Sequence, residues 1–452
     1  MFNKIEANHL IAQEIICPPG CEPKKISRKA KPKNSWGRDS VSLSHSSRHK
    51  STKICQPQVS IQGMKQIDPD EPPQQVTLIE YPCEPMLNPD ICIREDHYGF
   101  MDADRPNFRK VEGIYGTGQP NFRGLKKIIT DLGGGSKKIY WTNLRAEPVI
   151  YIKDEPYSLR SHDDIDYSLI YPNVDTGLVE KMEKDFKAEV LDKMKKGEPV
   201  EFCGEGKDGK VCEIKYPPGS LKSEDVKTLT EIFKGLKKYN IDYQRVPIDD
   251  NRRPSNQDFD SLVKRYNNYD PHAEYITNCM GGWGRTTTSM TIFNIMRSIE
   301  DKNYRPLSQL PAIREEIKAE GKGNFKKLRT MFTAVKVAET LVKHGIIKGN
   351  GGDDFLKIIE DEGKSGCPIC LEISRAAKED PKRVSEYVER YLYLAYFYQY
   401  SQEHDYDNYP VTFSDWIKPH ESKIKMMTSG LSKLFKAEAW LDKHWEGKKD
   451  GQ

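Results

Sequence analysis

One glycine-rich loop constrains the fold of this chain more than any other part of its sequence. The loop begins at Cys279 and continues Met280-Gly281-Gly282-Trp283-Gly284-Arg285-Thr286. A strand-like segment, 274–278, precedes it. The segment that follows, 285–300, has one apolar helical face, formed by Met290, Phe293, Met296 and Ile299. Three glycines let backbone N–H groups point into one concavity at a helix N-terminus, where the helix dipole favours an anion. The pattern predicts a strand–loop–helix cradle for phosphate.

The residue types in this loop favour nucleophilic phosphoryl chemistry. A helix N-terminus favours the thiolate form of a cysteine placed there, so we expect Cys279 to be the nucleophile. Arg285 offers a planar fork for two phosphoryl oxygens, and Thr286 offers a hydroxyl to the thiolate. We expect the backbone of the intervening loop to bind the substrate phosphate, through Met280, Gly281, Gly282, Trp283 and Gly284. The predicted reaction is phosphomonoester hydrolysis through a cysteinyl-phosphate, without a metal ion or a cofactor.

The leaving oxygen needs a proton, and a second segment offers the acid. Residues 241–246 read as a strand, and the loop after it carries Asp249 and Asp250 and reaches Pro254. A carboxyl group on a loop at the carboxyl edge of the sheet is suited to protonate a leaving group. We favour Asp250 as the general acid, with Asp249 as the alternative.

Strand-like and helix-like patterns alternate along the chain after Phe108, which predicts an α/β domain with a mainly parallel central sheet flanked by helices. Expected strands are 139–144, 149–152, 241–246 and 275–278, with a hairpin from 200–203 and 211–214. Expected helices are 177–195, 223–237 with Ser223 as its N-cap, 285–300, 381–400 and 429–445.

Composition divides the chain into four expected regions. Residues 1–60 form a basic tail that we expect to be disordered. Within it, residues 24–53 carry ten basic side chains against one acidic, a net charge of +9 in a chain of +3. Residues 61–106 are proline-rich and read as a linker or an extended arm on the domain surface. The catalytic domain is expected at 107–348, with a helical C-terminal extension at 349–452 packed on it.

The basic tail has two readings, a solubilising segment or a peripheral attachment to anionic membrane. Trp36 is the only aromatic residue among its charges, which argues against nucleic acid. The sequence contains no transmembrane segment, no signal peptide in 1–19 and no disulfide framework among its ten cysteines. We therefore expect reduced thiols and a cytoplasmic protein, with Cys203 facing Cys212 in the hairpin and no zinc or redox role for Cys367 and Cys370.

Several ordered motifs make the chain resemble the protein tyrosine phosphatase-like inositol phosphatases, and among them the paladin-like members most closely. The motifs are VEGIYGTGQPNFRGLKKI (111–128), YWTNLRAEPVIYI (140–152), PYSLR (156–160), VEKMEKDFKAEVL (179–191), NCMGGWGRTTTSM (278–290), ERYLYLAYFYQY (389–400) and FSDWIKP (413–419). The resemblance implies a cysteine-phosphatase fold that acts on phosphorylated inositols or phosphoinositides. An aspartate four residues before a proline is the acid in that wider family, which selects Asp250.

The chain departs from that pattern at the loop. Tyrosine phosphatases usually have histidine immediately before the nucleophile, whereas this chain has Asn278, which resembles the paladin-like members. Trp283 also brings a bulky indole into the loop. The loop has no lysine, so charge for a polyphosphorylated ring must come from elsewhere; the candidates are Arg145, Arg252, Arg253, Lys326 and Lys327. Two other functions stay open: a phosphotyrosine or dual-specificity protein phosphatase, and a catalytically silent phosphate-binding scaffold.

Overall fold

The computed structural model describes residues 86–300, 369–404 and 411–446. Short gaps in the first range fall at 89, 97–101, 103, 112, 163–164, 166–167, 170, 172–173, 207–208, 214–215, 251 and 268–269. The basic tail, most of the expected linker, Lys326, Lys327 and Cys367 lie outside the described residues. Every described residue belongs to one of the two compact units of the chain, the one that contains residues 75–452.

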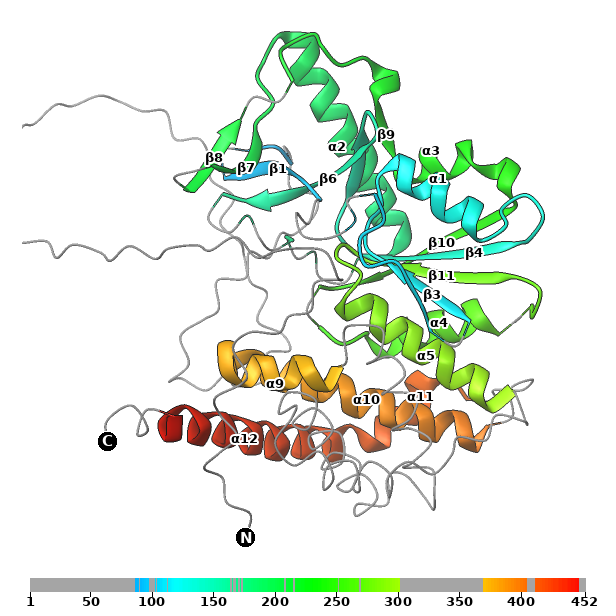
Figure 1. Ribbon diagram of the computed structural model, residues 1–452, viewed down its shortest axis with the longest axis vertical. Coiled ribbons are helices and arrows are strands. Elements are labelled where there is room, and N and C mark those ends of the chain that lie inside the picture. Colours follow the sequence, from blue (N-terminus) through cyan, green and yellow to red (C-terminus); the bar gives the residue numbers. More distant parts are fainter. Residues whose placement is uncertain are drawn as a thin grey trace, which may run out of the picture. The chain divides into compact units, whose positions relative to one another are not determined.

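A five-stranded sheet carries the glycine-rich loop (Figure 1). Its order is β10 (Ile241–Ile248), β4 (Ile139–Arg145), β11 (Glu274–Asn278), β3 (Ile114–Thr117) and β2 (Arg109–Val111). The first four strands are parallel, and only β2 at the edge is antiparallel. The loop leaves the carboxyl end of β11, the central strand, where ligands of open α/β sheets characteristically bind.

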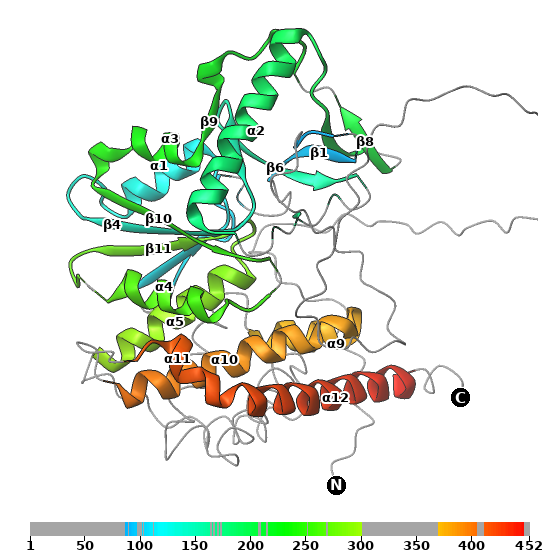
Figure 2. The same ribbon diagram turned by 180° about the vertical axis from the view of Figure 1, so that it is seen from behind.

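Helices cover both faces of this sheet (Figure 2). On one face, α1 (Phe122–Asp131) and α3 (Leu229–Gly235) share an apolar cluster with Trp141 of β4 and Ile276 of β11. On the other face lie α4 (Asn256–Tyr266) and α5 (Gly284–Glu300). Side-chain N-caps begin α1, α3 and α4, so each helix starts where its sequence specifies.

The expected apolar face of α5 is buried, with Met290, Phe293 and Met296 at most 1% exposed. Beyond α5 lie the C-terminal helices α9 (Ile369–Glu379), α10 (Val384–Glu403), α11 (Phe413–Ile417) and α12 (Glu421–Glu446). Helix α10 packs on α5 and on α12 and buries most of its tyrosines in the same core cluster as α4 and α5. The C-terminal helices are thus part of the core that supports the loop.

A second sheet of six strands is mainly antiparallel, which the sequence patterns did not indicate. Its order is β8 (Gly209–Glu213), β7 (Phe202–Gly206), β1 (Ile91–Glu95), β6 (Glu155–Ser161), β5 (Val149–Ile152) and β9 (Val226–Thr228). Only β1 and β7 run parallel. Helix α2 (Thr176–Lys196) packs Met182, Phe186, Val190 and Met194 into the core of this sheet.

Two parts of this second sheet correct sequence expectations. Residues 91–95, which we assigned to a linker or surface arm, form β1, and Cys92 and Ile93 are fully buried. The strand is held by pairing with β6 and β7, which lie more than 60 residues away and leave no local signal. The folded region therefore begins before Phe108.

The sulfur atoms of Cys92 and Cys203 form a disulfide across β1 and β7. The expectation of reduced thiols throughout is therefore wrong for this pair, and the cytoplasmic location that rested on it stays a prediction. Cys203 does pair in register with Cys212 in the hairpin, as expected, but its sulfur is bonded to Cys92.

The prediction of a helix over 223–237 is wrong for the first half of that range. Ser223 opens only a 3₁₀ turn, η1 (Ser223–Asp225), and residues 226–228 pair with β5 as strand β9. The true N-cap is Thr228, which exchanges hydrogen bonds with Glu231 in a capping box. The Thr-x-x-Glu capping signature is visible in the sequence and marks the start of the helix at Thr228. The helix does not start at Ser223 because the β-branched residues Val226 and Thr228 favour a strand. The other short 3₁₀ turns are η2 (Lys237–Tyr239), η3 (Pro381–Arg383) and η4 (Lys418–His420).

The α/β fold with a largely parallel central sheet and flanking helices is confirmed. None of the helices in the described ranges is both long enough and apolar enough to cross a membrane.

Candidate active site

Cys279 is the first residue after β11, and its side chain is buried. The loop curls back through Gly282, whose φ of +76° lies in the left-handed region. A Cβ atom at Gly282 would lie 2.5 Å from the backbone nitrogen of Gly118, so only glycine fits there. Helix α5 then begins at Gly284. The sequence prediction of a strand, a tight loop and a helix around Cys279 therefore agrees with the structure.

The loop is held from outside by hydrogen bonds to its carbonyl groups. The Gly282 carbonyl accepts from Asn107 Nδ2 at 2.8 Å and from Arg109 Nη1 at 2.7 Å. The Met280 carbonyl accepts from the Gln119 backbone N–H at 2.7 Å. These hydrogen bonds fix the backbone of the loop from its outer side. Arg109 also donates to Thr287 Oγ1 at 2.9 Å and so ties the loop to the first turn of α5.

Asn278 fixes the entry into the loop. Its Oδ1 accepts from Trp141 Nε1 at 2.8 Å, and its Nδ2 donates to Gln119 Oε1 and to the Cys279 carbonyl, each at 3.3 Å. An amide can donate and accept at the same time without carrying charge into this buried site. Asn278 therefore positions the backbone of Cys279, which explains why asparagine serves at this position.

The Thr286 hydroxyl differs from its expected role. In the structure it donates to the Thr117 carbonyl at 3.3 Å, rather than to the thiol of Cys279. Trp283 is half-buried.

Arg285 is almost completely buried and is held by carboxylates on two sides. Its Nη1 and Nη2 donate to the two carboxylate oxygens of Glu147 at 2.7 and 2.9 Å, and Nη1 also donates to the Ile248 carbonyl at 3.1 Å. Its Nε lies 3.2 Å from Asp250 Oδ1. Burial alone would lower the pKa of Arg285, but Asp250 and Glu147 outweigh that effect and raise it well above its usual value. The guanidinium is therefore permanently charged.

Behind Arg285 lies a buried chain of alternating charges. Arg145 donates to Glu147 at 2.8 Å and to Asp96 at 2.6 Å, and Arg160 donates to Asp96 at 2.9 Å. Burial opposes ionisation of Glu147, but Arg285 and Arg145 hold its pKa far below the usual range. Arg160 also donates to the sulfur of Met280 at 2.8 Å, so the chain ends against the loop itself. These contacts fix both the loop and the orientation of Arg285.

The two acid candidates face different surroundings. Asp250 points at the Nε edge of Arg285, beside the loop. Asp249 lies 3.8 Å from Arg252 and lines a separate cavity of about 490 Å³ with Ser255 and Asp258. Burial raises the pKa of Asp249, while Arg252 and Arg285 oppose the rise. Of the two carboxylates, Asp250 is the one in contact with a residue of the loop.

The five basic residues that we expected to supply charge for a polyphosphorylated ring fall into three groups. Arg145 is fully buried in the charge network, and Arg253 is engaged by Glu389 at 3.0 Å and stacks 3.6 Å above the Tyr393 ring. Arg252 is half exposed and remains accessible. Lys326 and Lys327 lie outside the described residues.

Sequence reasoning missed the residues that support the loop, and most of them lie inside motifs that it had already noted. Glu147 belongs to the 140–152 motif and Arg160 closes the 156–160 motif. Arg390, in the 389–400 motif, lies so close to Gly284 that a Cβ there would be 2.9 Å from its Nη1. A charged residue inside an apolar motif was the available signal, because a buried charge requires a partner.

The part of the chain that contains this loop is similar to a known protein family. Residues 142–297 match the family model of the PTP-like phytases, whose description reads "Inositol hexakisphosphate". The matched segment runs from the middle of β4 to the end of α5 and therefore contains Glu147, the Asp250 loop and the glycine-rich loop.

Curated relatives of the chain are paladins. Paladin of Gallus gallus is 26% identical over 335 residues, covering 69% of this chain and 36% of that protein. Paladin of Homo sapiens is 26% identical over 368 residues, covering 73% of this chain and 38% of that protein. The chain thus spans little more than a third of the length of these relatives. The family match and these relatives confirm the resemblance to the paladin and PTP-like inositol phosphatase family.

Solved structures also resemble this chain. The tandemly repeated PTP-like phytase of Mitsuokella multacida is 18% identical, with a TM-score of 0.48, over 74% of this chain and 49% of that chain. A PTP-like phytase from Bdellovibrio bacteriovorus is 16% identical, with a TM-score of 0.45, over 72% of this chain and 94% of that chain.

Proposed function

We propose that this protein is a phosphomonoester hydrolase that acts on phosphorylated inositols through a cysteinyl-phosphate intermediate. Cys279 serves as the nucleophile, Arg285 binds the phosphoryl oxygens and Asp250 is the general acid. The loop backbone from Met280 to Gly284 binds the phosphate. The arrangement of Arg285 between Glu147 and Asp250 carries this proposal.

A guanidinium has two edges on which it can bind a pair of oxygens. Glu147 occupies the edge formed by Nη1 and Nη2, and the Ile248 carbonyl takes another N–H of Nη1. The edge formed by Nε and Nη2 faces Asp250, whose Oδ1 lies 3.2 Å from Nε, and on this edge we expect two phosphoryl oxygens to bind in place of Asp250. A phosphate bound on this edge would lie beside the Asp250 carboxyl group, which we assign as the proton donor to the leaving oxygen.

The reaction then follows in two steps. The Cys279 thiolate attacks phosphorus, the P–O bond to the substrate breaks, and Asp250 protonates the departing alkoxide. A water molecule, deprotonated by the same carboxylate, attacks the phosphocysteine and releases phosphate and the thiolate. The loop N–H groups and Arg285 stabilise the phosphoryl charge throughout, since they are in place before the reaction begins.

The family description supports an inositol phosphate as substrate. Arg252, half exposed beside the acid loop, is a described cation available to a second phosphate of such a ring. A more specific substrate would be a phosphoinositide in an anionic membrane. The basic segment 24–53 favours this substrate because its net charge of +9 is attracted to anionic lipid.

The test is phosphate release from a panel of inositol phosphates, vesicle-borne phosphoinositides and phosphotyrosine peptides, with Cys279→Ser as the inactive control. We expect release from the inositol compounds and none from the control, because serine is not activated by this loop. Release from phosphopeptides alone would reassign the protein as a protein phosphatase. Binding of the inositol compounds without release would make it a silent phosphate-binding scaffold.

A further inference from the structure

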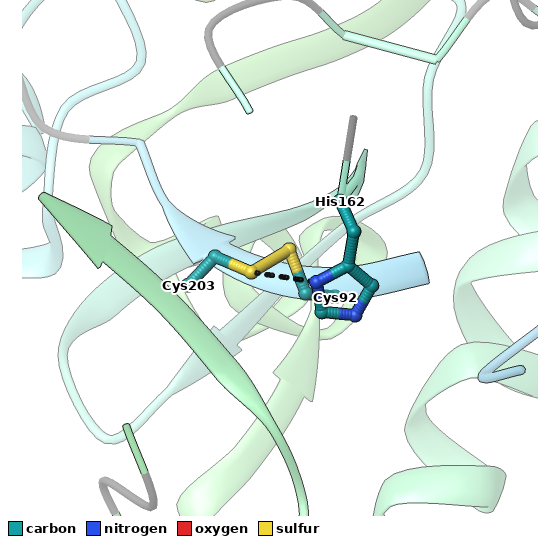
Figure 3. Close-up of side chains that lie close together, drawn as sticks. All are labelled: Cys92, His162 and Cys203. Atoms are coloured by element: carbon teal, nitrogen blue, oxygen red, sulfur yellow. Dashed lines mark hydrogen bonds between the residues drawn. A yellow bond between two sulfur atoms is a disulfide. The ribbon is translucent and has the colours of Figure 1, made fainter. Parts of the chain in front are cut away.

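Three side chains from distant parts of the chain meet in the second sheet (Figure 3). They are Cys92 on β1, Cys203 on β7 and His162, the residue after β6. The imidazole Nδ1 lies 3.7 Å from Cys203 Sγ, and the potential ligand atoms of all three residues lie within 4.8 Å of one another. No sequence motif indicates that these three residues lie together, since the two cysteines are 111 residues apart.

The backbone holds this group in place independently of the disulfide. The His162 N–H donates to the Asp90 carbonyl at 3.0 Å, and the Ile93 N–H donates to the Glu201 carbonyl at 3.2 Å. Strand β1 lies between β6 and β7, so its residue Cys92 has a neighbour on each side. These sheet contacts keep the three side chains together when the sulfur atoms are not bonded.

The spacing suits a tetrahedral zinc ion. Zn–S bonds of about 2.3 Å and Zn–N bonds of about 2.0 Å place neighbouring ligand atoms roughly 3.5–3.8 Å apart. The distance of 3.7 Å between His162 Nδ1 and Cys203 Sγ already falls in that range. The two sulfur atoms must separate from their bonded distance, by rotation of their side chains, for the three residues to occupy three corners of a tetrahedron.

The surroundings of His162 place a carboxylate near its second ring nitrogen. Its other nitrogen, Nε2, lies 3.7 Å from the Glu201 carboxylate. A histidine that binds a metal through one nitrogen commonly presents the other to a carboxylate, which fixes its tautomer. Ile165 is buried against the two sulfur atoms on the apolar side, whereas the His162 side chain is 27% exposed. An ion can therefore enter past His162 and keep one water molecule as its fourth ligand.

We propose that reduction converts the Cys92–Cys203 disulfide into a zinc site formed by both thiolates and His162. A dithiol reductant supplies two electrons and two protons: the Cys92–Cys203 S–S bond breaks, and one forms in the reductant. Each cysteine then loses its proton as Zn²⁺ binds, so the two thiolates neutralise the ion. Oxidation by a disulfide reverses the steps and releases zinc. This site is separate from the glycine-rich loop and does not depend on the proposed phosphatase activity.

The test compares the oxidised and reduced full-length chain. The chain is reduced with a phosphine, desalted without oxygen and titrated with Zn²⁺ against a chromophoric chelator; Co²⁺ is titrated in parallel to reveal thiolate-to-metal charge-transfer absorption. We expect one tight site in the reduced chain and none at that affinity in the oxidised chain. His162→Gln should lose the tight site, and Glu201→Gln should weaken it by roughly 10–100-fold.

Cys212→Ser is the matched control, because Cys212 is the register partner of Cys203 in the same hairpin. It should leave the tight site intact. His162→Gln is the primary variant, since its partly exposed side chain can change without disturbing the core, whereas Cys92 is fully buried. Equal zinc affinity in wild type and His162→Gln would overturn the proposal, as would loss of the site in Cys212→Ser or equal binding by the oxidised chain.

Discussion

Arg285 meets Glu147 on one edge and Asp250 on the other, and these two carboxylates have different tasks. Glu147 makes two hydrogen bonds and is itself held by Arg145, so it acts as a fixed support. Asp250 approaches from the loop after β10, and its Oδ1 lies 3.2 Å from Arg285 Nε. At the scale of single residues, we therefore assign the support of Arg285 to Glu147 and propose acid catalysis for Asp250.

The acid assignment predicts a dependence on the leaving group. Asp250→Asn should slow the hydrolysis of inositol phosphates by roughly 10²–10⁴-fold, because the alkoxide leaves without a proton. An activated aryl phosphate should be affected much less, since its leaving group needs no proton. Steady-state kinetics with both substrates measure this difference. If Asp249→Asn shows the dependence and Asp250→Asn does not, Asp249 is the acid.

Asp249 has a stability signature of its own. Burial raises its pKa in the folded state, so its charged form costs stability at neutral pH. Asp249→Asn removes that charge and should raise Tm by about 1–4 °C near pH 7. The gain should shrink as the pH falls through the raised pKa of the folded state, and it should vanish below the ordinary carboxyl pKa of about 3.9, where the wild-type group is protonated in both states. Thermal melts across this pH range test the sign. A lower Tm for the variant at neutral pH would mean that Arg252 and Arg285 stabilise the charge.

At the scale of elements, the loop between β11 and α5 depends on one left-handed residue. Gly282→Ala should lower kcat/KM by at least about 10²-fold, because the new methyl group displaces the loop against the backbone of Gly118. Gly219→Ala is the matched control: Gly219 has a similar φ of +77°, but a Cβ atom at this position would meet nothing within 4 Å. Both variants should lose roughly 1–3 kcal/mol of stability from backbone strain. Comparable activity loss in the two would show that strain, rather than loop displacement, is responsible.

The elements around this loop were predictable because their signals are local. The apolar periodicity of 285–300 gave α5, and the apolar runs of 139–144 and 275–278 gave two strands of the parallel sheet. What the sequence did not reveal depends on distant partners. Strand β1 forms by pairing with β6 and β7. Cys92 is bonded to Cys203, and Glu147 accepts hydrogen bonds from Arg285, which lies 138 residues away. Spacing along the chain carries no information about such pairs.

At the scale of the whole molecule, charge is distributed unevenly. Residues 24–53 carry +9, so the rest of the chain carries −6. Deleting residues 1–60 should weaken binding to anionic vesicles and lower activity on a vesicle-borne substrate. The effect should shrink at 1 M salt, where the Debye length is about 3 Å. Activity on a soluble inositol phosphate should stay within about twofold, because every residue named in the site above lies after Glu95 in the chain. Equal vesicle binding by both forms would leave the segment a solubilising role.

The proposed function depends on one atom, the sulfur of Cys279. The most direct test is to quench the wild-type enzyme with acid during turnover of an inositol phosphate and to locate covalent phosphate by mass spectrometry of its peptides. We predict one phosphoryl group on the sulfur of Cys279, because the thiolate attacks phosphorus before water does. Turnover without phosphate on Cys279, or phosphate on a different residue, would contradict the account.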